Sequence, residues 1–233
     1  MALVISVLTP DWLLQVSDAP AAVPRTIKLQ RHGAPGLLSV LGQAELIPGL
    51  IPELERRTLA DPSELAGWLA TELGARCRGE DPTTALLAGW GVSPEGHRAS
   101  WRWRVSNFEV DGDEGPFAIE GSWIVPSYAQ PGGLGRARAK TSFSVQVSST
   151  VPLPDGISRG LEKLPRDLRR NISPTELAIR LAGWVQQTHA SCPALIALLR
   201  PNGSFEGGLL HEEGLSPMRA PAGDGVSALS PAT

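Results

Sequence analysis

The chain has 233 residues, 42% of them hydrophobic and 19% charged, which is enough apolar sequence to bury a substantial core in one domain. Its formal net charge of -3 gives no general attraction to nucleic acid or to an anionic membrane, so neither is expected as a partner. The apolar runs are shorter than the roughly 18 residues of a membrane span, and no basic residue precedes Leu3–Leu8 to form a signal peptide. Cys77 and Cys192 lack metal-ligand spacing, and two thiols in such a chain indicate a reduced, cytoplasmic protein.

The N-terminal segment is expected to form two β-hairpins. The first has its turn at Pro10-Asp11, where proline supplies the φ angle that a type I turn needs. The second turns at Arg31–Pro35. The four predicted strands are Leu3–Leu8, Trp12–Val16, Thr26–Gln30 and Gly36–Leu41.

Three helices are predicted from proline positions, capping residues and apolar spacing. Pro48 and Pro52 argue against a long helix near Ile47–Leu59, so a helix is expected from about Ile51. Asp61 is a strong N-cap, with proline next and glutamate at the third helical position, and Gly74 can close that helix. Ser173 repeats the cap before Pro174. The apolar faces contain Leu65, Trp68, Leu69 and Leu73 in one helix, and Leu177, Leu181, Trp184 and Val185 in the other.

Sequence typical of strands surrounds the second capped helix. In the clearest case, Trp101, Trp103 and Val105 alternate with Arg102 and Arg104, the period-two pattern of a half-buried strand. The other predicted strands are Thr84–Trp90, Phe117–Val125, Phe143–Val147, Ala194–Leu199 and Phe205–Leu210, the last two joined by the turn Pro201-Asn202-Gly203. We therefore expect one domain over residues 1–212. Residues 213–233, poor in large apolar side chains, are expected to be a disordered tail.

The order of strands and helices resembles the N-terminal-nucleophile (Ntn) hydrolases, in particular the proteasome β-subunit branch. Four short segments carry the resemblance: Val16-Ser17-Asp18, Ile27-Lys28-Leu29, Ser39–Ala44 and Ala118–Ser122. It implies an α+β fold, a four-layer αββα sandwich with largely antiparallel sheets. It also implies that Asp18 and Lys28 lie near the nucleophile, that the amide of Gly42 helps to form an oxyanion hole, and that Ser122 lies near the active site.

The residue that would make this family catalytic is missing. After removal of Met1 the free amine belongs to Ala2, where active members have a hydroxyl or thiol that attacks the substrate carbonyl. Trp123 follows Ser122 where a small residue is expected, and residues 126–165 form an insertion. The leading hypothesis is therefore a pseudoenzyme, a non-catalytic assembly or binding subunit that associates with copies of itself or with a related subunit.

Two other functions stay open. One is an amide hydrolase or peptidase with an unconventional nucleophile, for which Ser122, Lys28 and Asp18 are the residues to test. The other is a phosphate-binding or small-molecule-binding module that uses the basic loop 131–141, although Leu134 and Ala139 break the phosphate-loop pattern there. Asp18 and Lys28 are read either as part of an oxyanion-like pocket or as a structural ion pair. No metal or cofactor is expected, because the four histidines are scattered.

Overall fold

The fold is known from a computed structural model. It describes residues 3–19, 25–31, 34–43, 46–56, 61–77, 81–108, 117–125, 143–170, 172–188, 192–211, 214–219, 227–228 and 230–231. None of the helices in these ranges combines the length and the apolar character that crossing a membrane requires.

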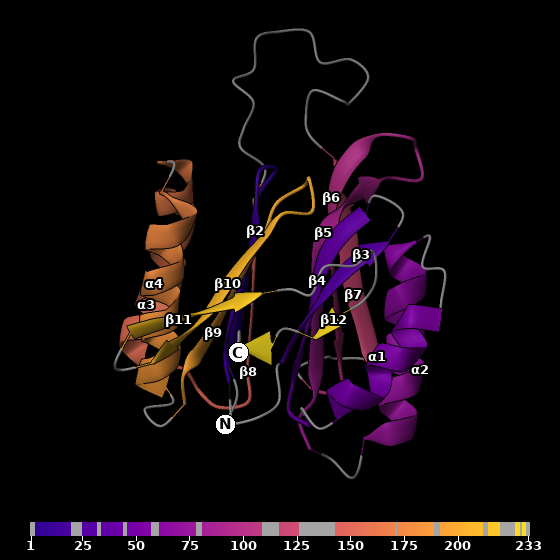
Figure 1. The fold of residues 1–233 in the computed structure, drawn as a ribbon, viewed down its shortest axis with the longest axis horizontal. Coiled ribbons are helices and arrows are strands. Elements are labelled where there is room, and N and C mark those ends of the chain that lie inside the picture. The colour runs from indigo at the N-terminus through magenta and orange to yellow at the C-terminus, as the bar shows by residue number, and fades with distance from the viewer. Residues whose placement is uncertain are drawn as a thin grey trace, which may run out of the picture.

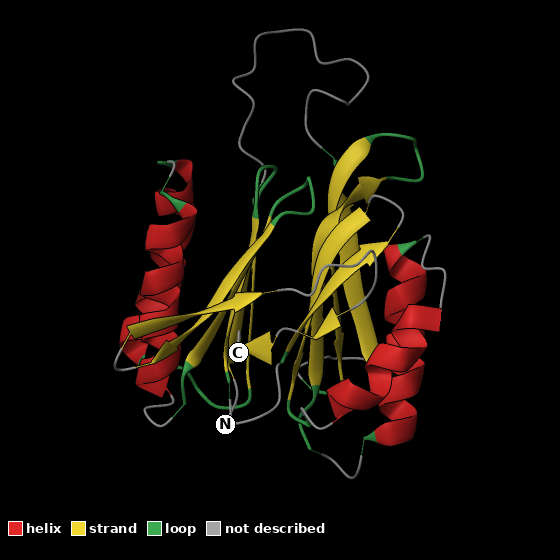
Figure 2. Cartoon of the chain, in the orientation of Figure 1, coloured by secondary structure: helices red, strands yellow, loops and turns green. Residues whose placement is uncertain are grey.

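Two sheets lie face to face in the centre of the molecule (Figures 1 and 2). The seven-stranded sheet has the order β13-β11-β10-β9-β2-β1-β8 and the six-stranded sheet the order β12-β3-β4-β5-β6-β7. All of their strand pairs are antiparallel. The strands of the first are β1 (Leu3–Leu8), β2 (Leu13–Asp18), β8 (Ser144–Ser149), β9 (Ala194–Leu199), β10 (Phe205–His211), β11 (Gly214–Arg219) and β13 (Ser230–Pro231). Those of the second are β3 (Thr26–Arg31), β4 (Ala34–Leu41), β5 (Thr84–Val92), β6 (Arg98–Ser106), β7 (Ala118–Ile124) and β12 (Ser227–Ala228).

Four helices pack on the outer faces of the sheets (Figure 1). Helices α1 (Ile47–Arg56) and α2 (Pro62–Arg76) bury apolar side chains against the six-stranded sheet. Helices α3 (Asp155–Arg169) and α4 (Pro174–Thr188) do so against the seven-stranded sheet. A third apolar cluster, which includes Leu37, Trp90 and Leu195, fills part of the space between the sheets.

The helices cover only part of each sheet. Helix α4 packs mainly on β1, β2 and β9, and α2 mainly on β6 and β7. The side chains of β11 from Gly214 to Pro217 are exposed. The predicted fold class, a four-layer αββα sandwich of the Ntn-hydrolase type, is therefore wrong. The structure is a β-rich α+β fold of two antiparallel sheets with four helices that cover them incompletely.

The two predicted helix caps are confirmed. The side chain of Asp61 accepts a hydrogen bond from the backbone N–H of Ser63 at 2.8 Å, and Ser173 Oγ accepts one from the N–H of Glu176 at 3.1 Å. These contacts satisfy N–H groups that have no partner inside the helix, which explains why both helices begin where the sequence predicts.

Helix α3 was not located from the sequence, in which Gly156, Gly160 and Pro165 are unfavourable residues for a helix interior. Gly160 has a packing role instead: a Cβ at this position would lie 2.4 Å from the ring of Trp184 on α4. Part of residues 213–233 also differs from the prediction. Strands β11, β12 and β13 lie within that range, paired to β10, β3 and β11 respectively, so these residues join the sheets.

Candidate functional site

Asp18 holds the start of the first strand. Its Oδ1 accepts a hydrogen bond from the backbone N–H of Leu3 at 3.0 Å, and Arg25 Nη2 lies 3.2 Å from its Oδ2. Both side chains are buried, with exposed fractions of 1% for Asp18 and 7% for Arg25. Ala2, the predicted nucleophile position, lies outside the described residues. The Asp18 carboxylate is thus bonded to the backbone of Leu3, the residue after Ala2, and paired with the buried guanidinium of Arg25.

Arg25 joins Asp18 to Gly42. Its Nη1 donates to the carbonyl oxygen of Gly42 at 3.4 Å, so one guanidinium links the end of β2 to the end of β4. Gly42 has a φ of 86°, and a Cβ there would lie 2.2 Å from the carbonyl oxygen of Pro82, so only glycine fits without displacement. We call Asp18, Arg25, Gly42 and the Leu3 N–H the Asp18 cluster.

Sequence reasoning missed Arg25. The prediction paired Asp18 with Lys28, but the charged partner of Asp18 among the described residues is Arg25. One signal was available: Arg25 stands directly before β3, and Asp18 ends β2, so the connection between the two strands brings them close. Lys28 itself is on β3, 8% exposed, opposite Leu37 of β4 in the sheet register.

A buried polar network crosses from one sheet to the other near this cluster. Gln15 Oε1 on β2 accepts a hydrogen bond from Ser39 Oγ on β4 at 2.6 Å, and Ser39 shares a second one with Thr26 at 2.8 Å. Gln15 Nε2 also donates to Ser6 Oγ at 3.4 Å. Buried polar groups that find partners fix the relative position of the surfaces that carry them. These hydrogen bonds therefore fix the position of β2 relative to β4.

Ser122 lies far from the Asp18 cluster. Along one row of the six-stranded sheet, Lys28 is opposite Leu37, Leu37 opposite Ala88, Ala88 opposite Arg102, and Arg102 opposite Ser122. Ser122 is therefore four strands from Lys28, a separation of roughly 19 Å at about 4.8 Å per strand. The structure brings Asp18 and Gly42 together through Arg25, and it does not bring Ser122 to them.

Ser122 belongs instead to a pocket of about 350 Å³ between the edges of the two sheets, which we call the edge pocket. Strands β6 and β7 form one wall and β8 forms the other. The lining residues are Arg102, Arg104, Glu120, Gly121, Ser122, Val145, Gln146 and Val147. A volume of this size matches the lower end of small-ligand sites.

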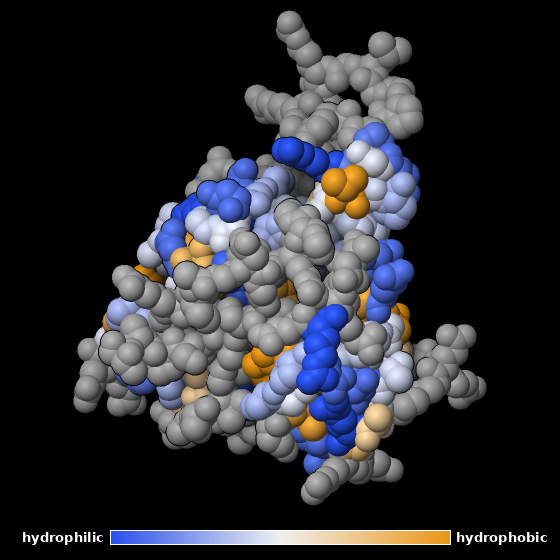
Figure 3. All heavy atoms as spheres, turned by 45° about the vertical axis from the view of Figure 1, so that its right-hand side comes forward, coloured by the Kyte–Doolittle hydropathy of each residue, from blue (hydrophilic) through white to orange (hydrophobic). Residues whose placement is uncertain are grey.

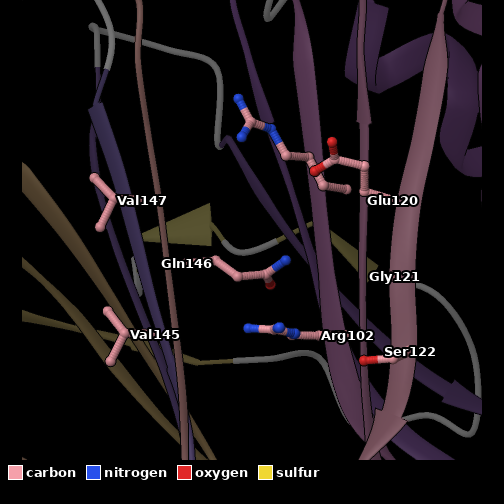
Figure 4. A pocket seen from close by; sticks show the side chains of 8 residues that line it. Arg102, Glu120, Gly121, Ser122, Val145, Gln146 and Val147 are labelled. Atoms are coloured by element: carbon pink, nitrogen blue, oxygen red, sulfur yellow. The ribbon is translucent and has the colours of Figure 1, made fainter. Parts of the chain in front are cut away.

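The side chains that point into the edge pocket are polar (Figure 4). Gln146 extends from β8 toward β6, Arg102 extends back toward β8, and the hydroxyl of Ser122 faces the same gap, whereas Val145 and Val147 point away. Arg102 Nη1 donates to Ser144 Oγ of β8 at 2.6 Å and so ties the two walls together. The alternation of β6 explains this wall, because Trp101 and Trp103 pack toward α2 while the arginines face the other sheet.

The structure gives no support to the other sites considered from the sequence, the basic loop and a metal centre. The basic loop 131–141 lies outside the described residues. Within the described ranges, no group of three or more His, Cys, Asp or Glu side chains gathers in a way that could hold a metal ion.

Comparisons with known proteins give no family for this chain. No protein-family model matches it, and no curated protein is significantly similar. The resemblance to the proteasome β-subunits therefore has no support beyond the segments quoted above.

Proposed function

We propose that this protein works by binding, as a non-catalytic binding or assembly subunit, and not through an N-terminal nucleophile. This is the role that the missing N-terminal nucleophile implies for a chain that resembles the proteasome β-subunit family. The observation that carries the proposal is the Asp18 cluster: the carboxylate that would serve catalysis is occupied by the Leu3 N–H and by Arg25. Because removing either member of a buried ion pair leaves an uncompensated charge, Asp18 is committed to Arg25.

The sequence supports the same proposal. Alanine at position 2 offers a methyl group where the chemistry needs a hydroxyl or thiol. The rival, an amide hydrolase that uses Ser122 with Lys28 and Asp18, needs these side chains within hydrogen-bond reach of one another. Because Ser122 is separated from Lys28 by four strand spacings, the three residues do not form one catalytic group.

The test is reaction with a broad covalent probe for N-terminal nucleophiles, read by intact mass and peptide mapping. We expect the wild-type mass to shift by loss of Met1 at most, with no adduct. The Ala2→Thr variant is the matched control, because it places a hydroxyl at the new N-terminus if Met1 is removed, and labelling of this variant alone would show that the probe reaches the site. An adduct on the wild-type protein, at Ser122 or elsewhere, would contradict the proposal.

An assembly role depends on the exposed surface of the protein. Among the described residues, the exposed large hydrophobic side chains come from four different elements, namely Val92 of β5, Ile119 of β7, Ile179 of α4 and Leu215 of β11. The coloured part of the face in Figure 3 shows only small hydrophobic areas that lie apart from one another. Light scattering at several concentrations tests self-association directly: a ring or dimer supports an assembly role, and a monomer throughout leaves binding of another molecule as the function.

A further inference from the structure

The edge pocket is lined by three charged side chains, Arg102, Arg104 and Glu120, and Arg104 is directly opposite Glu120 in the sheet register. Arg102 donates to Ser144, and no carboxylate pairs with it among the described residues. The side chain of Glu120, on the neighbouring strand, accepts no hydrogen bond and forms no ion pair within the described ranges. A half-buried guanidinium without a carboxylate partner retains donors that can bind a planar oxyanion in bidentate fashion.

The sheet register sets the distance between Arg102 and Glu120. Arg102 is directly opposite Ser122, and Glu120 is two residues before Ser122 on β7. Arg102 and Glu120 are therefore diagonal neighbours on one face, with backbones about 7–8 Å apart. Because both side chains are long and face the same gap, a small molecule can contact both at once (Figure 4).

We infer that the edge pocket binds a small zwitterion of the amino-acid class, with its carboxylate on Arg102 and its ammonium group at Glu120. Gln146 and Ser122 face the same space and supply neutral donors and acceptors for the rest of the ligand. Glu120 disfavours a second carboxylate close to it, whereas Arg102 and Arg104 together attract anions, so phosphate is the competing ligand to test. The inference builds on the binding role proposed above, but it depends on residues outside the Asp18 cluster.

The experiment is isothermal titration of the full-length protein with the free L-amino acids, followed by analogues of the tightest binder. The N-acetyl form lacks the cation, the amide form lacks the anion, and inorganic phosphate tests for a simple anion site. We expect at least one free amino acid to bind, and both blocked forms to bind at least about tenfold more weakly.

Variants assign the two charges. Arg102→Gln should weaken binding of that amino acid by about tenfold to a hundredfold, as expected for loss of a charge-assisted contact. Glu120→Gln should weaken it by roughly threefold to tenfold, because Glu120 is more exposed. The matched controls are Arg98→Gln, on the same strand as Arg102 but outside the pocket lining, and Glu162→Gln, exposed on α3. Both controls should bind like the wild type.

Three results would overturn the inference. They are binding of phosphate or the N-acetyl form as tightly as the free amino acid, equal loss in the Arg98 control, and absence of any binder among the amino acids. Thermal unfolding of each variant, followed by circular dichroism, shows whether a loss of binding comes from loss of the fold, and Arg102→Lys then serves as the milder replacement that keeps the charge. A panel without binders would leave the covalent-probe result untouched, so the failures of the two proposals are distinguishable.

Discussion

On the side of β2 and β3, the carboxylate of Asp18 is enclosed, bonded to the chain and paired with a buried arginine. On the side of β6 and β7, the carboxylate of Glu120 is exposed and Arg102 reaches into a pocket without an acidic partner among the described residues. Both pairs lie beside the space between the same two sheets. The Asp18 cluster therefore has the properties of a structural joint, by which we mean a set of buried contacts that holds strand ends together. The edge pocket has the properties of a binding site.

The position of each pair in the sheets explains the difference. Strands β4 and β5 face β1 and β2 near the middle of the seven-stranded sheet, where Gln15 of β2 and Ser39 of β4 bridge the sheets. Strands β7 and β8 are the last strands at one edge of their respective sheets, and the edge pocket lies between these edges. An enclosed charge must find a partner, whereas an open one keeps its hydration and can exchange it for a ligand.

The largest expected effect comes from breaking the Asp18 cluster. Asp18→Ala removes the acceptor of the Leu3 N–H and leaves Arg25 as a buried, uncompensated charge. The free energy of unfolding should fall by about 3–5 kcal/mol, measured by urea denaturation. Asp11→Ala is the control, since this exposed carboxylate is in the same β1–β2 hairpin and should cost under about 0.5 kcal/mol. Equal costs for the two variants would show that the cluster is not a joint.

A second variant tests the same joint through its backbone. Gly42 and Gly96 both have positive φ angles, 86° and 81°, but a Cβ at Gly42 meets the Pro82 carbonyl oxygen at 2.2 Å, whereas a Cβ at Gly96 meets nothing within 4 Å. Gly96→Ala should therefore cost about 1 kcal/mol for the strained backbone alone. Gly42→Ala should cost about 2–4 kcal/mol, because the backbone must also move. Urea denaturation of both variants measures the difference, and a smaller cost at Gly42 would contradict the crowding.

The edge pocket should respond in the opposite way. Replacing Arg102 or Glu120 by glutamine should change the free energy of unfolding by less than about 1 kcal/mol, because neither side chain has a charged partner among the described residues and both reach solvent. Thermal and urea unfolding of the two variants check this. A loss as large as that of Asp18→Ala would make the pocket a second joint and remove the contrast.

Local features of this fold could be predicted from the sequence. The caps at Asp61 and Ser173 depend only on residues within one turn, and the alternation of Trp101 to Arg104 is set by the pleat of a single strand. Helix α3 also has a local signal, with Ile157, Leu161, Leu164 and Leu168 on one face, but two glycines and a proline interrupt it and the sequence analysis did not use it.

Non-local pairings could not be predicted in the same way. Which cation meets Asp18 depends on the connection from β2 to β3, and how far Ser122 lies from Lys28 depends on the order of five strands in one sheet. The edge pocket is formed by β8 facing β6 and β7, which no short segment encodes. The predicted sandwich was wrong about how much of each sheet the helices cover. That extent also depends on how all the elements pack together, and no local pattern determines it.

The smallest expected effect is on the pKa of Glu95, an exposed carboxylate outside both regions. It shows how far one local hydrogen bond shifts the pKa of a carboxylate that is not buried. Glu95, in the turn between β5 and β6, accepts a hydrogen bond from Ser93 Oγ at 2.7 Å, which lowers the pKa of Glu95 below its usual value of 4.5, with a backbone hydrogen bond of Glu95 and nearby His97 acting in the same direction. A lowered pKa in the folded state contributes stability that is present above the ordinary pKa and is lost as the pH falls through the folded-state pKa.

NMR titration of the side-chain carboxyl carbon of Glu95 should therefore give a pKa below 4.5 in the wild type and a higher one in Ser93→Ala. Ser204→Ala, at an exposed serine of the β9–β10 turn, should leave the pKa of Glu95 unchanged. If Ser93→Ala also leaves the pKa of Glu95 unchanged, the Ser93 hydroxyl is not the cause of the shift. A single exposed hydrogen bond would then be too weak to serve as a reference for the partners of Asp18 and Glu120.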